Sequence, residues 1–215
     1  MRARLKVCCI ASVDEARLAI EHGATALGLV SEMPSGPGPI PDELIAEIAR
    51  AVPVGTDTFL LTCLSDPAGV VDQVRRAGTT TVQLVDDVEE DVYAALRREL
   101  PHVRIVQVVH VQDRDSIDQV RRAQDHTDMI LLDSGRPRAA VRELGGTGRT
   151  HDWTISVRIV ESCSKPVFLA GGINPANVRD AIDQVRPYGI DLCTGVRTNG
   201  ALDPGKLAAL TFQMR

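Results

Sequence analysis

The stretch Leu5-Lys6-Val7-Cys8-Cys9-Ile10-Ala11-Ser12 (residues 5–12) decides between two fold classes. Residues 5–10 form an apolar run typical of a buried strand, and residues 12–15 (Ser-Val-Asp-Glu) have the capping-box pattern that begins a helix. A doubly wound open sheet would favour a glycine-rich loop between the first strand and the first helix, and residues 9–12 contain no glycine. The stretch therefore favours a closed barrel of alternating strands and helices.

The same alternation continues along the whole chain. Continuous apolar strands separated by helix-period segments indicate a parallel sheet that is covered by helices. The predicted strands are residues 5–10, 26–30, 56–62, 80–85, 104–109, 129–132, 167–170 and 190–193. The predicted helices are residues 12–22, 42–51, 67–77, 89–100, 115–123, 154–162 and 175–185, with a last helix from Pro204. Eight strands and eight helices in 215 residues predict an α/β fold, a single (β/α)8 TIM barrel over residues 1–215.

Composition and charge exclude several classes of partner. A hydrophobic content of 44% with 25% charged residues is ordinary for a soluble globular protein. A net charge of −5 and an aromatic content of 3% argue against binding to nucleic acid. No apolar run approaches the roughly 18 residues needed to span a bilayer, so we expect no membrane partner.

Cysteine and histidine usage indicates a reducing compartment without metal. The five cysteines are odd in number and form no CxxC pair, and the five histidines are scattered without metal-ligand spacing. We therefore expect a cytoplasmic protein with no disulfide framework and no zinc site.

The chemistry of a barrel of this kind is found at the C-terminal ends of its strands. Cys8 and Cys9 end the first strand; strand neighbours point to opposite faces, so the two thiols cannot do the same job. Taken alone, a cysteine in a buried strand such as Cys8 is more often an inert core residue than a reactive thiol. Asp133 ends an apolar strand, where it could cap a helix or form a salt bridge. Desolvation there would raise its pKa and suit it to general-acid catalysis.

Three glycine-rich turns point to a bound phosphate. Backbone N–H groups at tight turns and helix N-termini bind phosphate, and the loops after strands seven and eight are the usual place for it in this fold. A single such turn indicates flexibility only, but three that meet on one rim favour a phosphate site. The residues concerned are Gly171 and Gly172, Thr194 and Gly195, and Gly146 and Gly148.

Several motifs spread over nearly the whole chain match one enzyme family. They are Lys6-Val7-Cys8-Cys9, Ala26-Leu27-Gly28-Leu29, Asp133 after its aliphatic run, Gly145-Gly146-Thr147-Gly148 with Asp152-Trp153, residues 169–178 (Leu-Ala-Gly-Gly-Ile-Asn-Pro-Ala-Asn-Val), and residues 186–191 (Arg-Pro-Tyr-Gly-Ile-Asp). With these motifs the chain resembles the phosphoribosylanthranilate isomerases, which are (β/α)8 enzymes of tryptophan biosynthesis.

The resemblance implies an aldose–ketose isomerase, an intramolecular oxidoreductase that converts an N-(5-phosphoribosyl) amine into a 1-deoxyribulose 5-phosphate by an Amadori rearrangement. Asp133 would protonate the ring oxygen, and Cys8 as thiolate would remove the C2 proton. A thiol suits this role because its pKa lies near neutrality and is readily lowered. The resemblance implies a small phosphoribosyl substrate and no metal or organic cofactor. Cys9 replaces a family glycine and is expected to pack outward against the helices.

The chain also departs from the family pattern around the amine. The family has Ser-Pro-Arg after strand two, whose arginine faces the anthranilate carboxylate, and residues 31–41 here contain no arginine. Either another arginine replaces it, or the substrate carries no carboxylate at that place. The amine-pocket candidates are Arg136, Arg138 and Arg197 in the first case, and His110, Asp86 and Glu32 in the second. An altered amine substrate, an altered reaction and a non-catalytic phosphosugar-binding paralogue remain alternatives, as do a monomer and a homodimer.

Overall fold

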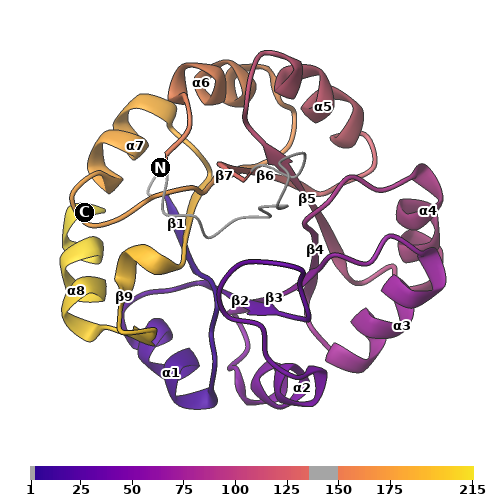
Figure 1. Cartoon of the computed structure of the whole chain (residues 1–215), viewed down its shortest axis with the longest axis horizontal. Coiled ribbons are helices and arrows are strands. Elements are labelled where there is room, and N and C mark those ends of the chain that lie inside the picture. Colours follow the sequence, from indigo (N-terminus) through magenta and orange to yellow (C-terminus); the bar gives the residue numbers. More distant parts are fainter. Residues whose placement is uncertain (1–2, 136–149) are drawn as a thin grey trace.

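The strands close into a complete barrel. The computed structural model describes residues 3–135 and 150–215. Its barrel strands follow one another in the order β1 to β8, each parallel to its neighbours, and β8 returns to pair with β1. The helices form a ring around the strands (Figure 1). The predicted (β/α)8 barrel is confirmed, and the open doubly wound sheet is excluded.

Most predicted elements lie where the sequence pattern places them. The strands are β1 (Arg4–Val7), β2 (Ala26–Val30), β3 (Asp57–Thr62), β4 (Thr81–Leu84), β5 (Arg104–His110), β6 (Met129–Asp133), β7 (Val167–Leu169) and β8 (Gly189–Leu192). The helices are α1 (Val13–Glu21), α2 (Asp42–Ala51), α3 (Pro67–Ala77), α4 (Glu90–Glu99), α5 (Asp115–Ala123), α6 (Trp153–Ser162), α7 (Val178–Val185) and α8 (Pro204–Gln213). The sequence did not predict the 3-10 turn η1 (Thr194–Val196) or the hairpin of β9 (Arg197–Thr198) and β10 (Ala201–Leu202). Elements of two or three residues are too short to leave a periodic apolar pattern.

Local capping explains why the helix boundaries are predictable. The Ser12 hydroxyl accepts a hydrogen bond of 3.1 Å from the Glu15 N–H, and the Glu15 carboxylate accepts one of 3.0 Å from the Ala11 N–H. Helix α3 begins after Asp66, whose side chain accepts from the Gly69 N–H, and ends at Gly78 in the left-handed conformation (φ 64°). These contacts satisfy the free N–H and C=O groups at helix ends, so each boundary depends on a few neighbouring residues.

Strand β1 is shorter than predicted. It ends at Val7, because Cys9 adopts a left-handed backbone conformation with φ 62° that an extended strand does not contain. The chain stays attached to both neighbouring strands: the Cys8 N–H donates to the Leu192 carbonyl (2.8 Å) and the Ile10 N–H to the Gly28 carbonyl (3.0 Å). Because Cys9 is not in an extended strand, its side chain need not point to the face opposite that of Cys8.

The inside of the barrel has its own core, separate from the core between strands and helices. Phe59 and Phe168 meet edge to face there, with 6.0 Å between ring centroids. Gly189 leaves room for this pair, since a Cβ at that position would overlap the Phe168 ring. The fully buried Lys6 places its Nζ 5.1 Å from the centre of the Phe59 ring. These side chains fill the inside of the barrel below the C-terminal ends of the strands.

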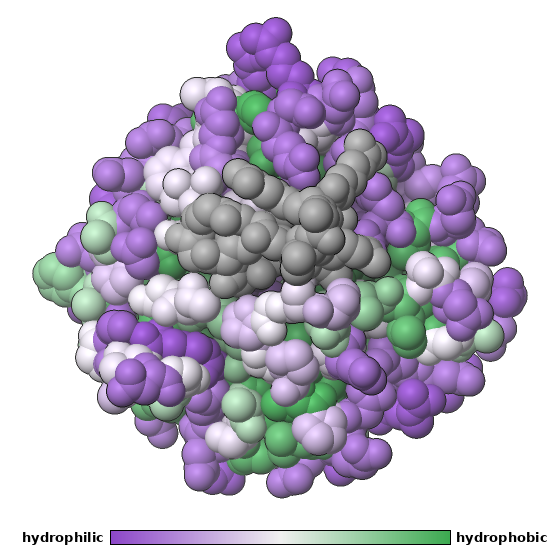
Figure 2. All heavy atoms as spheres, viewed as in Figure 1, coloured by the Kyte–Doolittle hydropathy of each residue, from purple (hydrophilic) through white to green (hydrophobic). Residues whose placement is uncertain are grey.

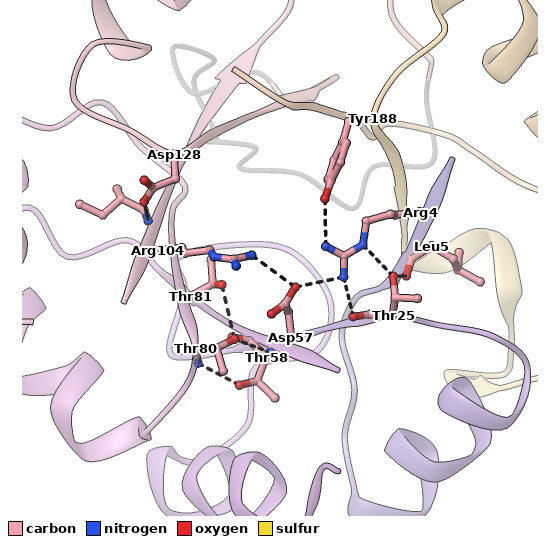
Figure 3. A network of polar contacts seen from close by, with 11 residues as sticks. Arg4, Leu5, Thr25, Asp57, Thr58, Thr80, Thr81, Arg104, Asp128 and Tyr188 are labelled. Carbon is pink, nitrogen blue, oxygen red and sulfur yellow. Dashed lines mark hydrogen bonds and ion pairs between the residues drawn. The ribbon is translucent and has the colours of Figure 1, made fainter. Parts of the chain in front are cut away.

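A polar network joins the N-terminal ends of the strands (Figure 3). The Arg4 guanidinium lies 3.0 Å from the Asp57 carboxylate and donates to the Tyr188 hydroxyl at 3.1 Å. Arg104 approaches the same carboxylate at 3.8 Å. One carboxylate thus ties β1, β3 and β5 together at the end of the barrel opposite the expected site.

The outer surface is mainly polar. On the face drawn in Figure 2, hydrophilic side chains dominate the rim. Among the described residues, the large hydrophobic side chains with substantial exposure are Val54, Leu64 and Phe212. Within the same part of the chain, none of the helices has the length and apolar character that crossing a bilayer requires.

Substituting Asp57 tests the polar network. Asp57→Asn is expected to lower the free energy of unfolding by about 1–2 kcal/mol, because the partly buried Arg4 guanidinium loses its charge partner and the exposed Arg104 loses a weaker one. Asp72→Asn removes a partner from an exposed ion pair of 3.0 Å with Arg75 and is the control, with an expected change below about 0.5 kcal/mol. Urea unfolding followed by circular dichroism measures both, and equal effects would contradict the assigned role of Asp57.

Candidate active site

A pocket opens at the C-terminal end of the barrel. It is lined by residues at or just after the ends of all eight barrel strands, among them Cys8, Gln83, Asp133 and Asp191. Residues 33 and 35–37, from the connection between β2 and α2, also line it. The predicted acid and the predicted base therefore share one pocket, in the place where barrels of this kind carry their active sites.

Cys8 follows β1 and is almost fully buried. Its side chain fits against β2 because the facing residue is Gly28: a Cβ there would lie 2.5 Å from the Cys8 sulfur. Burial raises the pKa of the Cys8 thiol to about 11, although the nearby Lys6 ammonium lowers it. The expectation of a pKa near neutrality was wrong for the free protein, since the thiol lies out of water and near the carboxyl groups of Asp191 and Asp133.

Asp133 ends β6, opposite His110 of β5 in the strand register. Burial raises its pKa, and this effect outweighs the opposing effects of His110 and of the Ser134 N–H, which donates to the carboxylate at 2.7 Å. The direction agrees with the prediction from sequence. A carboxyl group of raised pKa keeps its proton longer and is suited to donate it.

A buried ion pair lies beside these two groups. The fully buried Lys6 donates from Nζ to Asp191 Oδ2 at 2.8 Å. Burial alone would lower the pKa of Lys6, but the charges of Asp191 and Cys8 outweigh it and the pKa is raised. The ammonium therefore stays charged beneath the pocket, close to both Cys8 and Asp133.

Two oxygen atoms in the pocket have no hydrogen-bond partner among the described residues. They are Asp191 Oδ1 and Gln83 Oε1, and both residues line the pocket. Unpaired buried acceptors are costly unless a ligand or water satisfies them. Lys6, Gln83 and Asp191 were not among the site residues predicted from the sequence. The available signal was a polar residue at an inward position of an apolar strand, as Lys6 is two residues before Cys8.

The turns after β7 and β8 come together as predicted. Gly171, Gly172 and Thr194 line the pocket, and both glycines have positive φ angles (86° and 65°). Gly195 packs against the Ile173 carbonyl, where a side chain would not fit. Gly146 and Gly148, like Arg136 and Arg138, lie outside the described residues. Four of the six predicted phosphate-site residues are therefore adjacent at one side of the pocket.

The remaining amine-pocket candidates do not line this pocket. Arg197 pairs with Glu15 through two contacts of 2.9 Å, and its guanidinium also donates to the Cys9 carbonyl. Glu32 is exposed on the connection that follows β2. His110 and Asp86 line a neighbouring polar pocket formed by β4, β5 and α5.

Cys9 and Cys193 form a disulfide, with their Cα atoms 5.9 Å apart. The prediction of no disulfide was therefore wrong, and so was the prediction that Cys9 packs outward, since both cysteines line the pocket. The pairing was hidden because 184 positions separate the two residues and only barrel closure brings them together. Within the described residues, no group of three or more His, Cys, Asp or Glu side chains has a metal-binding arrangement.

Comparisons with known proteins agree with this geometry. A family model described as N-(5'-phosphoribosyl)anthranilate (PRA) isomerase matches residues 5–213. N-(5'-phosphoribosyl)anthranilate isomerase of Methanocella arvoryzae is 34% identical over 193 residues, which cover 90% of this chain and 88% of that protein. N-(5'-phosphoribosyl)anthranilate isomerase 2 of Methanosarcina mazei is 36% identical over 206 residues, covering 95% and 90%.

Solved structures show the same fold. The phosphoribosyl anthranilate isomerase of Thermotoga maritima superposes with a TM-score of 0.83 at 25% identity, covering 99% of this chain and 98% of that one. A phosphoribosyl anthranilate isomerase in complex with reduced 1-(o-carboxyphenylamino)-1-deoxyribulose 5-phosphate superposes with a TM-score of 0.79 at 23% identity, over 99% and 98% of the two chains. Because one family model matches nearly the whole chain, and relatives above 30% identity cover most of it, the chain belongs to the phosphoribosylanthranilate isomerase family.

Proposed function

We propose that this protein converts N-(5'-phosphoribosyl)anthranilate into 1-(o-carboxyphenylamino)-1-deoxyribulose 5-phosphate, a step of tryptophan biosynthesis. The observation that carries the proposal is the presence of Cys8 and Asp133 in one buried pocket, next to the glycine turns after β7 and β8. A protein that only bound phosphosugars would not need a proton donor and a proton acceptor in the same pocket. Membership of the family supports the choice of substrate.

The first step is the opening of the ribose ring. Asp133 donates its proton to the ring oxygen, the C1–O bond breaks, and the substrate becomes an open-chain iminium cation. The raised pKa of Asp133 supports this role, because the group must hold its proton until the ring oxygen accepts it.

The second step is removal of the C2 proton by the Cys8 thiolate. This yields an enolamine, which becomes the ketone when C1 gains a proton and the C2 hydroxyl loses one. With a pKa of about 11 in the free protein, the thiol needs help to ionise. The positive iminium and the Lys6 ammonium both favour the thiolate. The proton balance closes if the Cys8 proton passes to the Asp133 carboxylate, directly or through water, after ring opening and before the thiolate takes the C2 proton. Both groups then end the cycle protonated, as they began it.

The remaining polar groups bind the sugar and its phosphate. We assign the phosphate to the turns that contain Gly171, Gly172, Thr194 and Gly195, since tight turns offer backbone N–H groups to an anion. Asp191 Oδ1 and Gln83 Oε1 accept hydrogen bonds from ribose hydroxyl groups, which supplies the partners that they lack within the described residues.

The same rearrangement of a different phosphoribosyl amine is the second candidate. Among the described residues that line the pocket there is no arginine, and the connection after β2 contributes Met33, Ser35, Gly36 and Pro37. A carboxylate on the amine would find no guanidinium in this part of the chain. Turnover of other phosphoribosyl amines, with none of the anthranilate compound, would favour this candidate.

The cytoplasmic setting and the choice between monomer and homodimer stay predictions. A solved relative from Thermotoga maritima is described as dimeric. Gel filtration of this protein, alone and with light scattering, distinguishes the two states.

Removing either proton-transfer group should abolish catalysis. Cys8→Ala and Asp133→Asn are each expected to lower kcat/KM at least ~10²-fold, the usual lower contribution of a general acid or base. The loss of phosphoribosylanthranilate fluorescence measures turnover. Cys163→Ala is the control, because this free cysteine lies after α6 and does not line the pocket, and its kcat/KM should be unchanged. Full activity of either pocket variant would exclude the assigned role, and tight binding without turnover in the parent protein would favour a binding protein.

The ion pair below the pocket should set the ionisation of Cys8. Only the thiolate reacts with iodoacetamide, so the alkylation rate against pH, followed by peptide mass, reports the pKa of about 11. Lys6→Met should raise this pKa, because the ammonium lowers it, and Asp191→Asn should reduce it, because the carboxylate raises it. At pH 9, Cys8 therefore reacts more slowly in the first variant and faster in the second.

The double variant Lys6→Met/Asp191→Asn is the matched control for that experiment. It removes one charge of each sign, so its alkylation midpoint should lie between those of the single variants. An identical midpoint in all four proteins would contradict an electrostatic role for the pair.

A further inference from the structure

The disulfide joins the C-terminal end of β1, which carries the proposed base, to the C-terminal end of β8, which carries the proposed phosphate turn. Cys9 directly follows Cys8, the proposed base, and Cys193 directly precedes Thr194 at the turn proposed for phosphate. Both cysteines of the disulfide line the pocket. A covalent bond at this place links the position of the base to the position of the phosphate turn.

The conformation of Cys9 bears directly on Cys8. Its φ of 62° lies in the left-handed region that glycine adopts easily and other residues rarely adopt. The backbone N–H of Cys9 lowers the pKa of Cys8, so a displacement of the Cys9 backbone would change the ionisation of Cys8. Two contacts hold the residue there: the disulfide, and the hydrogen bond that its carbonyl accepts from Arg197.

The connection between β2 and α2 packs against Cys9. The Cys9 sulfur lies 3.5 Å from the Pro37 carbonyl oxygen, and Gly38 (φ 85°) packs so closely that an added Cβ would lie 2.5 Å from the Cβ of Cys9. Residues 35–37 in turn line the pocket. Movement of Cys9 would therefore move one wall of the pocket.

The other half of the disulfide supports the turn after β8. Cys193 is the residue before η1 (Thr194–Val196), and Gly195 of that turn packs against the β7 turn at Ile173. Cys193 is half-buried, whereas Cys9 is 5% exposed, so Cys193 is the sulfur that a reductant from solvent would attack.

We propose that the Cys9–Cys193 pair is a redox-active site that controls this pocket: the disulfide holds the base, the pocket wall and the phosphate turn in place, and its reduction weakens binding and turnover. The link to turnover rests on the proposed substrate and reaction, whereas the link to phosphate binding rests only on the proposed assignment of the phosphate to these turns. The reductant is a dithiol. Its thiolate attacks Cys193, the S–S bond breaks with release of the Cys9 thiolate, and the second thiol of the reductant resolves the mixed disulfide. Two electrons pass to the protein, both cysteines gain protons, and the reductant becomes a disulfide.

The test compares the oxidised parent protein with the same protein after dithiothreitol. Alkylation and mass spectrometry count the free thiols, which should be Cys8, Cys63 and Cys163 before reduction and two more after it. On reduction, kcat/KM should fall about tenfold and the dissociation constant for inorganic phosphate should rise several-fold. Cys163→Ser, a free cysteine outside the pocket, is the control and should keep the full response.

Two variants distinguish the effect of the disulfide bond from the effect of the left-handed conformation of Cys9. Cys193→Ser should match the reduced protein and show no response to dithiothreitol. Cys9→Gly/Cys193→Ser should also show no response but regain part of the activity, because glycine adopts the left-handed conformation without a disulfide.

The outcomes distinguish the two proposals. If phosphate affinity depends on reduction but no phosphoribosylanthranilate is turned over in either state, the proposed substrate is wrong and the redox site stands. If phosphate affinity and turnover are the same before and after reduction, or if five free thiols are counted in the oxidised protein, the redox proposal is overturned.

Discussion

The pairing of β1 with β8 is the constraint on which the site depends. Its register sets Lys6 opposite Asp191 and Val7 opposite Leu192, and the next residue, Cys8, donates its N–H to the Leu192 carbonyl. Residues from the two ends of the chain therefore become neighbours in the wall of one pocket. The buried ion pair and the disulfide both cross this seam, so the strands that close the barrel also assemble the proposed base, its electrostatic partner and the phosphate turn.

Burial has opposite consequences for the two proposed proton-transfer groups, although it shifts both pKa values in the same direction. It raises the pKa of both Cys8 and Asp133. For an acid, a raised pKa keeps the proton in place until the substrate needs it; for a base, it keeps the thiol in its unreactive form. The Lys6 ammonium partly compensates at Cys8, and a cation formed from the substrate would compensate further. In this arrangement Asp133 already holds its proton in the free protein, and Cys8 becomes a thiolate only as the reaction proceeds.

Most of the fold, and part of the site, could be predicted from the sequence. Helices α2, α3 and α5 begin and end where the periodic pattern places them, because a helix boundary depends on residues a few positions apart. The strand ends are less certain: β1 stops at Val7 because of one left-handed residue, Cys9. Asp133 was found by its place after an apolar run. Gln83 and Asp191 were not, since a polar residue at an inward strand position marks a polar site but does not show which groups it faces.

The sequence by itself determined the alternation of strands and helices, the absence of a glycine loop after the first strand, and the motifs that indicate the family. These are local patterns, and the physical forces behind them, backbone hydrogen bonding and amphipathic burial, act between near neighbours in the chain. Only the tertiary structure decided the direction of Cys9, its bond to Cys193, the engagement of Arg197 by Glu15, and the raised pKa of Cys8. Each of these depends on distance and exclusion of water between residues far apart in sequence, and barrel closure is what sets both.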